Sequence, residues 1–445
     1  MKTDKRFFCA ALLLAAALPA WAETVSATLP NGMKVLVKED KRAPVVSVRL
    51  WYKVGSVDEK AGKTGLSHAL EHMMFKGTPA YPSGEFNRKI SAMGGSNNAY
   101  TNRTETVYTA EIAAKNLPDL LKMEADRMAN LNFSDRDFDN EMKVIREERR
   151  MRTEDNPFGK LWENVNLKLW QKAANRAPVI GFMDDLHGLK ADDLRAWYGK
   201  WYAPNNAMLV VVGGVDAKET VKQAEAAFGK LAAKPLPERN DELERPSEFT
   251  GGEQTVYAVT ELPVINLNWR VAPQLSADDR AAAALDMLAA VLGGSDSSRY
   301  SRKLVRGEAV ALGVSPDTSD FGRENATFSI TAMPVAGVPL AVLQEKVLAE
   351  LRDVAENGVS EEELALIRRP LENSRIFAKD SVRHQADILG ALEHNGFGWQ
   401  SEDEEWKTVL SVTAEEVQAA AKKLLAQPYL TTTLLPQKQK GSPNE

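Results

Sequence analysis

Short segments in which apolar and polar residues alternate stand near the start of the chain. Residues 26–29 and 33–37 carry this pattern on either side of Pro30-Asn31-Gly32. Because Asn-Gly favours the tight turn of a β-hairpin, the two segments are predicted to form paired strands. Similar strand patterns recur further along the first half of the chain. The further predicted strands are residues 45–54, two strands within 99–112, and the continuously apolar segment 207–212.

Other segments of the first half have the composition of amphipathic helices. Ser134 is a typical helix N-cap, and Asp135 and Asp137 favour the positive end of the helix that follows. Asp216 begins a later helix in the same way. Helices are predicted over residues 65–78, 82–93, 117–130, 134–152, 160–174, 191–201 and 216–228.

The order of elements recurs in the second half of the chain. Residues 191–194, Ala-Asp-Asp-Leu, align with residues 414–417, Ala-Glu-Glu-Val, at an offset of 223 residues. At the same offset, the strand 207–212 aligns with residues 430–435. This repeat predicts two homologous halves. In the second half, strands are predicted at 256–260 and 265–271, and helices at 277–292, 340–356 and 360–377.

A chain of 445 residues is too long for one ordinary domain. Residues 234–252 contain three prolines, five acidic residues and a closing Gly-Gly pair, which predicts an exposed linker. We therefore expect an N-terminal domain at residues 23–233 and a C-terminal domain at 253–436. Residues 437–445 are predicted to be a disordered tail.

Residues 1–22 have the features of a cleaved secretory signal. Lys2, Lys5 and Arg6 precede an apolar run at 7–18, and residues 20–22, Ala-Trp-Ala, match a small-residue cleavage site. The apolar run is shorter than the about 20 residues that span a bilayer. No later stretch resembles a membrane span. We expect export to a bacterial periplasm, with secretion as the second choice.

Composition and charge narrow the possible partners. The chain is 44% hydrophobic and 27% charged, as expected for a globular protein. Its formal net charge is −6, and loss of the signal would change this to −8 and remove the only cysteine. A chain with this charge has no general basic field for nucleic acid. Without disulfides, its stability must come from its hydrophobic cores.

Residues 65–78 contain the strongest chemical signal. On a helix, His68 and His72 lie on one face about a turn apart, and Glu71 shares that face. Two imidazoles and a carboxylate suit a zinc ion and a base that activates water. The order His-x-x-Glu-His is the inverted form of a common zinc-peptidase motif. Because the chain has only five histidines, chance is a poor explanation for this spacing.

The third zinc ligand is not fixed by spacing. A catalytic zinc site uses three protein ligands and keeps a fourth position open. The predicted helix 134–152 offers Glu141, Glu147 and Glu148. Glu141 and Glu148 lie two turns apart on one face, and Glu147 is rotated by about 100° from Glu148. From composition alone, each of the three is better explained as part of a solvated charged face, and spacing does not choose among them.

Several motifs together resemble the pitrilysin/insulinase family of zinc peptidases, family M16. The resemblance covers nearly the whole mature chain and is strongest to the smaller bacterial members related to the mitochondrial processing peptidase. The motifs that carry it are Leu29-Pro30-Asn31-Gly32, Gly55-Ser56-Val57-Asp58-Glu59, residues 65–78, Asn98-Ala99 with Thr106-Val107-Tyr108, the helix 141–148, and Tyr202-Ala203-Pro204-Asn205-Asn206-Ala207.

The resemblance implies specific roles in a metal site. It implies that His68, His72 and Glu148 are the ligands of one Zn²⁺ ion per chain. Glu71 would be the catalytic base that takes a proton from water and passes it to the leaving amine. Glu141 matches a position that supports the site from behind the ligands.

The resemblance also implies a fold and a mode of substrate binding. The expected fold is α+β, with two homologous halves that enclose a chamber. Each half is expected to be a mainly antiparallel sheet with helices on one side. Asn98, Ala99, Tyr100 and Thr101 match the edge strand on which family members bind a peptide as an added strand.

One departure from the family pattern lies in the second half. Active members usually place an Arg and a Tyr after a Ser-Arg pair, where they help to hold the substrate. Here the pair is present at residues 298–299, and the expected Arg and Tyr fall at Val305 and Leu312. Arg306 is one residue away and would compensate only if the register slips. We therefore expect a heterodimer with a family M16-like partner that supplies the Arg and Tyr.

The sequence thus predicts a zinc-dependent endopeptidase that cleaves peptides or unfolded polypeptide segments. The alternative is a non-catalytic scaffold or binding subunit of a processing-peptidase-like complex. Loss of activity in such subunits usually erodes the zinc motif, whereas every ligand position is intact here. A protease that matures a cofactor is a third hypothesis, which the sequence leaves open.

Overall fold

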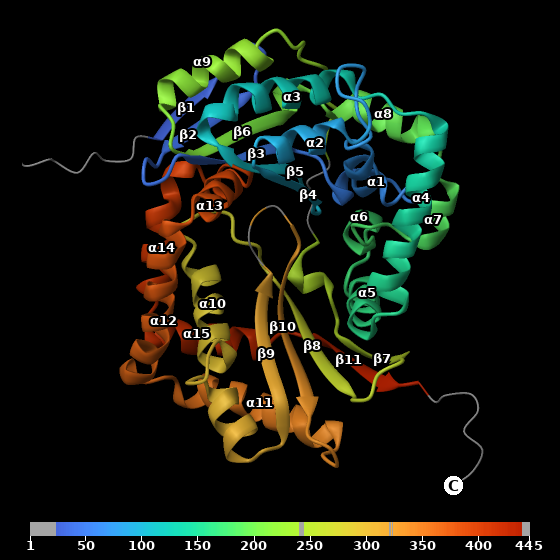
Figure 1. Ribbon diagram of the computed structural model, residues 1–445. Helices are drawn as coiled ribbons and strands as arrows, with labels where there is room; N and C mark the ends of the chain where they lie inside the picture. The colour runs from blue at the N-terminus through green and yellow to red at the C-terminus, as the bar shows by residue number, and fades with distance from the viewer. Residues whose placement is uncertain (1–23, 240–243, 320–321, 323, 438–445) are drawn as a thin grey trace, which may run out of the picture.

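The computed structural model describes residues 24–239, 244–319, 322 and 324–437 of the chain (Figure 1). The predicted signal segment 1–22 and nearly all of the predicted tail lie outside these residues. Two β-sheets, one in each half, form the framework of the molecule. Within the described residues, no helix is long and apolar enough to cross a membrane.

The first sheet has six strands in the order β1-β2-β6-β3-β5-β4. Its neighbouring strands are antiparallel except β2 and β6, which are parallel. All seven residues of β6 are buried, which explains its continuously apolar sequence. The strands predicted in the first half are thereby confirmed. Their bounds are β1 Thr24–Thr28, β2 Lys34–Glu39, β3 Val45–Tyr52, β4 Ser96–Thr101, β5 Thr106–Ala113 and β6 Ala207–Gly213.

The second sheet repeats this topology with five strands in the order β7-β11-β8-β10-β9. Here β7 and β11 form the parallel pair, in the places of β2 and β6, and the other pairs are antiparallel. Strands β9 and β10 were not predicted from the sequence. The matching order of the two sheets confirms two homologous, mainly antiparallel halves. The bounds are β7 Gly252–Ala258, β8 Val264–Val271, β9 Ala311–Ser319, β10 Ala326–Pro334 and β11 Tyr429–Pro436.

Helices cover one face of each sheet and form the two main hydrophobic cores. The predicted helices are present, although the one expected at 160–174 begins at Pro157, because the Asn156 side chain caps it, and ends at Leu169. In the first half the helices are α1 Leu66–Met73, α2 Glu85–Ala92, α3 Leu117–Asn130, α4 Asp135–Arg149, α5 Pro157–Leu169, α6 Ala173–Arg176, α7 Met183–Gly188, α8 Ala191–Trp201 and α9 Ala217–Phe228. In the second half they are α10 Arg280–Gly293, α11 Leu340–Asn357, α12 Glu361–Asp380, α13 Val382–His394, α14 Glu402–Leu410 and α15 Ala414–Leu425.

Each half also lends a helix to the opposite face of the other half's sheet. Helix α13 packs on β3 and β6, where Ala386 and Leu389 meet Trp51 and Val210. Helix α5 packs on β7 and β11, where Leu161 joins a small apolar core. This exchange covers part of the second face of each sheet and joins the halves.

The predicted linker 234–252 is not exposed throughout. Glu244 is buried, and its carboxylate accepts hydrogen bonds from the backbone N–H groups of Gln171 and Lys172 at 2.8 Å. The buried guanidinium of Arg270 lies 3.2 Å away. A buried carboxylate of this kind is stable only because its oxygens are paired. The linker therefore contributes a fixed contact between the halves.

Candidate metal centre

Helix α1 begins at a sharp change of chain direction. Gly65 has φ +86, and a Cβ there would lie 2.6 Å from the carbonyl oxygen of Ile180, so both conformation and space favour glycine. The buried carboxylate of Glu59 accepts hydrogen bonds from the N–H groups of Gly65 (2.6 Å) and Ser67 (2.7 Å). These are donors that a helix start leaves unpaired. Glu59 therefore fixes the first turn of the helix that carries His68 and His72.

The two histidines project from one face of α1 toward α4. Their ring centroids are 4.7 Å apart. The Nε2 atoms of His68 and His72 lie 3.7 Å and 3.4 Å from Oε2 of Glu148. By contrast, Glu147 is exposed and pairs with Arg150 at 2.5 Å. The structure thus brings Glu148, and not Glu147, to the histidine rings.

The donor atoms of His68, His72 and Glu148 all lie within 4.8 Å of one another. Ligand atoms held about 2.0–2.1 Å from a tetrahedral zinc ion are roughly 3.3 Å apart, close to the separations above. Oε2 of Glu148 is buried and has no hydrogen-bond partner in the described part of the chain. A buried carboxylate oxygen is rarely left in this way. The three residues therefore fit a zinc ion.

The charges around the two rings differ. Burial and the neighbouring charge of His72 lower the pKa of His68 to about 4. Burial also acts to lower the pKa of His72, but the hydrogen bond to Glu141 and the nearby carboxylates of Glu148 and Glu71 outweigh burial and raise that pKa to about 9. The acidic surroundings of His72 are those that would stabilise a cation.

Glu141 stands behind His72. Its Oε1 lies 2.9 Å from Nδ1 of His72, and its other oxygen pairs with Lys76. The hydrogen bond to His72 is the main cause that lowers the pKa of Glu141. An ionised Glu141 accepts a hydrogen bond from Nδ1–H of His72, so that in the neutral ring Nε2 carries the free electron pair and faces Glu148.

Glu71 lies beside the group of donor atoms without belonging to it. Its Oε2 accepts a hydrogen bond of 2.6 Å from Oγ1 of Thr101, at the end of β4. Burial raises the pKa of Glu71. A carboxylate whose proton affinity is increased in this way is suited to accept a proton and return it.

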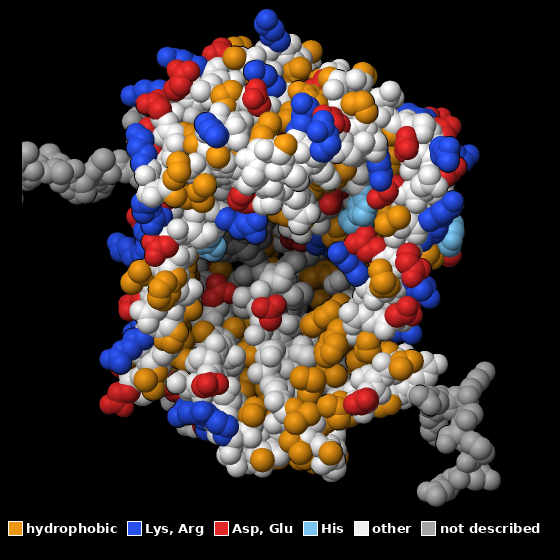
Figure 2. Space-filling view, in the orientation of Figure 1, with side chains coloured by type: hydrophobic (Ala, Val, Ile, Leu, Met, Phe, Trp, Pro, Cys, Tyr) orange, Lys and Arg blue, Asp and Glu red, His pale blue; other side chains and the backbone are white. Residues whose placement is uncertain are grey.

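The residues predicted to bind a peptide form the outer edge of the first sheet. Strand β4 pairs with β5 alone, so the backbone groups along its other edge pair with no strand of this sheet. Asn98, Ala99, Tyr100 and Thr101 all lie on it. Figure 2 shows a hollow between the halves with histidine and acidic side chains at its rim. A cavity of about 300 Å³ in this region is lined by residues of both halves, Tyr100 and Asp387 among them.

The structure also shows the two positions of the second half at which the family pattern has Arg and Tyr. Val305 packs partly against the second core, and Leu312 is half exposed on β9. The guanidinium of Arg306 donates a hydrogen bond to the backbone carbonyl of Asp296. In this structure Arg306 is thus engaged with its own half.

The second half retains a trace of the site. Asp286 on α10 accepts a hydrogen bond from Thr318 on β9, as Glu71 on α1 does from Thr101 on β4. In α10 the residues three before and one after this carboxylate are Ala283 and Met287, where α1 has histidines. The donor set is thus confined to the first half.

No role was predicted from the sequence for two groups at the site, Arg152 and Glu59. Arg152 pairs with Oε1 of Glu148 at 2.8 Å and so orients the carboxylate. Glu59 acts through the backbone of α1 as described above. The Glu148–Arg152 spacing of four residues favours an ion pair on a helix and could have indicated the first contact. The contacts of Glu59 depend on the turn of the chain at Gly65.

Comparison with known proteins places the chain in a family. The profile of insulinase, peptidase family M16, matches residues 34–181, and that of the M16 inactive domain matches residues 188–371. The chain belongs to peptidase family M16. It is 30% identical over 376 residues to zinc protease PqqE of Helicobacter pylori, covering 83% of this chain and 80% of PqqE. It is 28% identical over 423 residues to an uncharacterized zinc protease of Streptomyces coelicolor, covering 93% and 90%.

Solved structures of family M16 proteins share the fold. The crystal structure of a protease from Helicobacter pylori has a TM-score of 0.86 and 26% identity, covering 93% of this chain and all of that one. The first half of the periplasmic protease PqqL from Escherichia coli has a TM-score of 0.76 and 21% identity, covering 93% and 92%. The two-halved architecture is therefore that of family M16 peptidases.

Removal of the Glu59 carboxylate is expected to destabilise the first half. Glu59→Ala leaves two buried N–H groups at the start of α1 without an acceptor, which costs about 2 kcal/mol of the free energy of unfolding. Urea denaturation measures this loss. Glu219→Ala, in the exposed first turn of α9, serves as the control and should cost about 0.5 kcal/mol or less. Equal stability of the two variants would contradict the role assigned to Glu59.

Proposed function

We propose that this protein is a zinc endopeptidase acting on peptides or unfolded polypeptide segments. The observation that carries the proposal is the convergence of His68, His72 and Glu148 around one point, with Glu71 beside them. The names of the relatives, zinc proteases, support it. We assign the three converging side chains as ligands of one zinc ion per chain.

In the proposed reaction, the zinc ion and the residues around it have separate roles. Zinc, when bound, supplies a Lewis acid at the open side of the site. Glu71 takes a proton from water and later delivers it to the leaving amine, and its raised pKa suits both steps. Glu141 keeps His72 in the tautomer that presents Nε2 to the ion.

The substrate is proposed to add to the free side of β4. Backbone hydrogen bonds to Asn98, Ala99 and Tyr100 would hold an extended segment in register. Thr101 lies at the end of this strand and contacts Glu71, so a peptide that follows β4 would lead to the catalytic base. This mode needs an extended chain and would exclude folded domains.

The place of action is proposed to be the periplasm. The charged start, apolar run and cleavage-site pattern of residues 1–22 support export. The related PqqL of Escherichia coli is a periplasmic protease.

Metal removal tests the proposed activity directly. The purified mature protein should hydrolyse an unfolded polypeptide, lose this activity after chelation and dialysis, and regain it with one equivalent of zinc. The measurement is cleavage of a fluorogenic peptide alongside zinc analysis. Hydrolysis that persists at full rate in metal-free protein would contradict the proposal.

The absence of Arg and Tyr at positions 305 and 312 supports a divided site. We propose a partner subunit of family M16 type that supplies these two groups to the substrate held by this chain. The chain should then cleave peptides faster when mixed with its partner, recovered by affinity capture from the native periplasm. If the zinc-loaded chain alone cleaves peptides as fast as any mixture, the divided site is wrong.

A further inference from the structure

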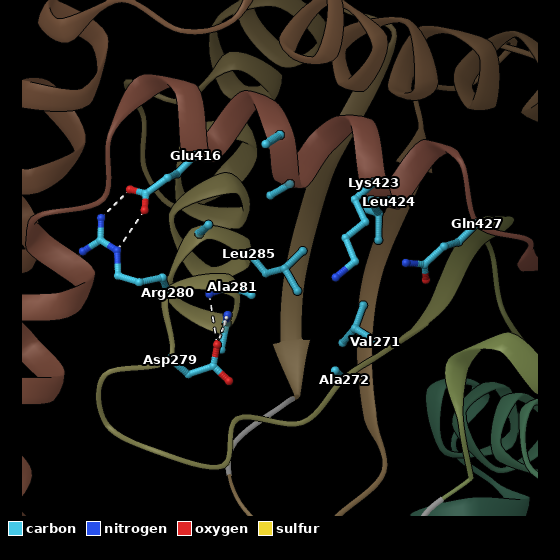
Figure 3. Close-up of a pocket in the computed structure, with 14 residues that line it drawn as sticks. Val271, Ala272, Asp279, Arg280, Ala281, Leu285, Glu416, Lys423, Leu424 and Gln427 are labelled. Atoms are coloured by element: carbon cyan, nitrogen blue, oxygen red, sulfur yellow. Dashed lines mark hydrogen bonds and ion pairs between the residues drawn. The ribbon is translucent and has the colours of Figure 1, made fainter.

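A mostly apolar cavity lies in the second half, away from the metal centre. It has a volume of about 310 Å³ and is formed by α10, α15 and the end of β8 (Figure 3). Ala284 and Leu285 line it from α10, Ala420 and Leu424 from α15, and Val271 from β8. A cavity of this size is large enough for a small ligand.

The internal repeat shows what fills the corresponding place in the first half. Helices α8 and α15 align at the offset of 223 residues, and they pack on α1 and α10 respectively. At this offset Trp197 corresponds to Ala420 and Trp201 to Leu424. Both tryptophans are buried in the first core. The second half thus has small or aliphatic side chains where the first half has two indole rings.

A lysine is common to both places. In the first half, Nζ of Lys200 lies 5.7 Å and 5.2 Å from the ring centroids of Trp197 and Trp201, a cation–π arrangement. Its counterpart at the offset is Lys423, which lines the cavity. In Figure 3 the amine end of Lys423 points into the space beside Leu285 and Val271. The second half thus keeps the lysine but lacks the two indole rings that the lysine contacts in the first half.

The other charged groups at the cavity are already paired. Asp279 accepts hydrogen bonds from the N–H groups of Ala281 and Ala282 at the start of α10. Arg280 and Glu416 pair with each other through two contacts. Across the described residues, the ammonium group of Lys423 has no such partner. The cavity therefore offers an apolar floor and one available positive charge.

We propose that this cavity binds an aromatic carboxylate, with its ring in the space that the two tryptophans occupy in the other half and its carboxylate on Lys423. The chemistry is that of an aromatic amino acid with a free carboxyl group, which either a small molecule or the C-terminus of a peptide presents. The proposal is independent of the peptidase activity.

Calorimetric titration of the zinc-loaded Glu71→Gln protein, in which a peptide would not be consumed, tests the proposal. N-acetyl-tryptophan is expected to bind with a Kd on the order of 0.1 mM. N-acetyl-tryptophanamide, which lacks the charge, should bind about threefold to fivefold more weakly. A short peptide ending in tryptophan with a free carboxylate separates the two sources. Stronger binding of the peptide assigns the site to peptide C-termini, and stronger binding of the amino acid assigns it to small molecules.

Substitutions in the cavity locate the binding. Ala420→Trp restores the side chain of the first half, fills the cavity and should abolish binding, and its thermal unfolding reports whether it folds. Lys423→Gln should weaken binding of the acid about threefold to fivefold and leave binding of the amide unchanged. Lys422→Gln, the matched control at the neighbouring lysine of α15, which does not line the cavity, should change neither. Binding that a folded Ala420→Trp protein retains, or the absence of saturable binding, overturns the proposal.

Discussion

Glu71→Gln is expected to lower kcat/KM for peptide hydrolysis by about 10³-fold. Glutamine keeps the shape of the side chain and its contact with Thr101, but it cannot take up a proton. Zinc content should stay the same, because Glu71 is not one of the three converging donors. Initial rates on a fluorogenic peptide and metal analysis of the same sample measure both effects.

The matched control for this variant is Glu147→Gln. Glu147 is exposed on α4 and pairs with Arg150, so its replacement should leave hydrolysis within about twofold of the unmodified protein. If Glu71→Gln is as active as Glu147→Gln, Glu71 is not the base. If the unmodified protein and Glu71→Gln both fail to cleave any peptide when a partner is present, the hypothesis of a non-catalytic scaffold is preferred.

Glu148→Gln is expected to weaken zinc binding by at least about 100-fold, since an amide is a poorer ligand than a carboxylate and one of three protein ligands is lost. Oε2 of Glu148 is the buried oxygen that faces both His68 and His72. Competition for zinc against a chromophoric chelator gives the affinity. Activity at limiting zinc should fall in parallel.

The neighbouring glutamate again provides the comparison. Glu147→Gln changes the same charge one position earlier on the same helix, and its zinc affinity should match that of the unmodified protein. Because both variants lose one negative charge from α4, the comparison tests which of the two side chains faces the histidines. Equal affinities for Glu148→Gln and Glu147→Gln would contradict the proposed ligand set.

Much of the fold could be predicted because local pattern and burial agree. The strand 207–212 is apolar throughout and is buried on both faces, and Ser134 caps α4 as its sequence indicates. Strand β9 was missed because Gly313, Pro316 and Asp317 interrupt the pattern expected of a strand. As an edge strand of the second sheet, it tolerates them.

Contacts between the halves could not be predicted from local sequence. Helix α13 places Ala386 and Leu389 on a sheet that is formed more than 150 residues earlier in the chain. The buried Glu244 in the predicted linker pairs with Arg270 and two backbone groups that only the folded chain brings near. These interactions depend on tertiary structure, which neither periodicity nor composition records.

The metal centre likewise has residues that the sequence predicts and residues that only the structure reveals. His68, Glu71 and His72 follow from spacing on one helix, since a turn of helix places them on one face. The choice between Glu147 and Glu148 needs the orientation of α4 against α1, which the structure supplies. Glu59 is nine residues from His68 and acts through a turn at Gly65, so its contribution was invisible before the fold was known.

Crystals of the mature protein grown with zinc, with diffraction data collected on both sides of the zinc absorption edge, give the most direct test of the proposed centre. We expect one strong anomalous peak per chain, about 2.0–2.2 Å from Nε2 of His68, Nε2 of His72 and a carboxylate oxygen of Glu148. A zinc peak bound by other residues, or no peak between these three side chains at full zinc occupancy, would contradict the proposed metal centre.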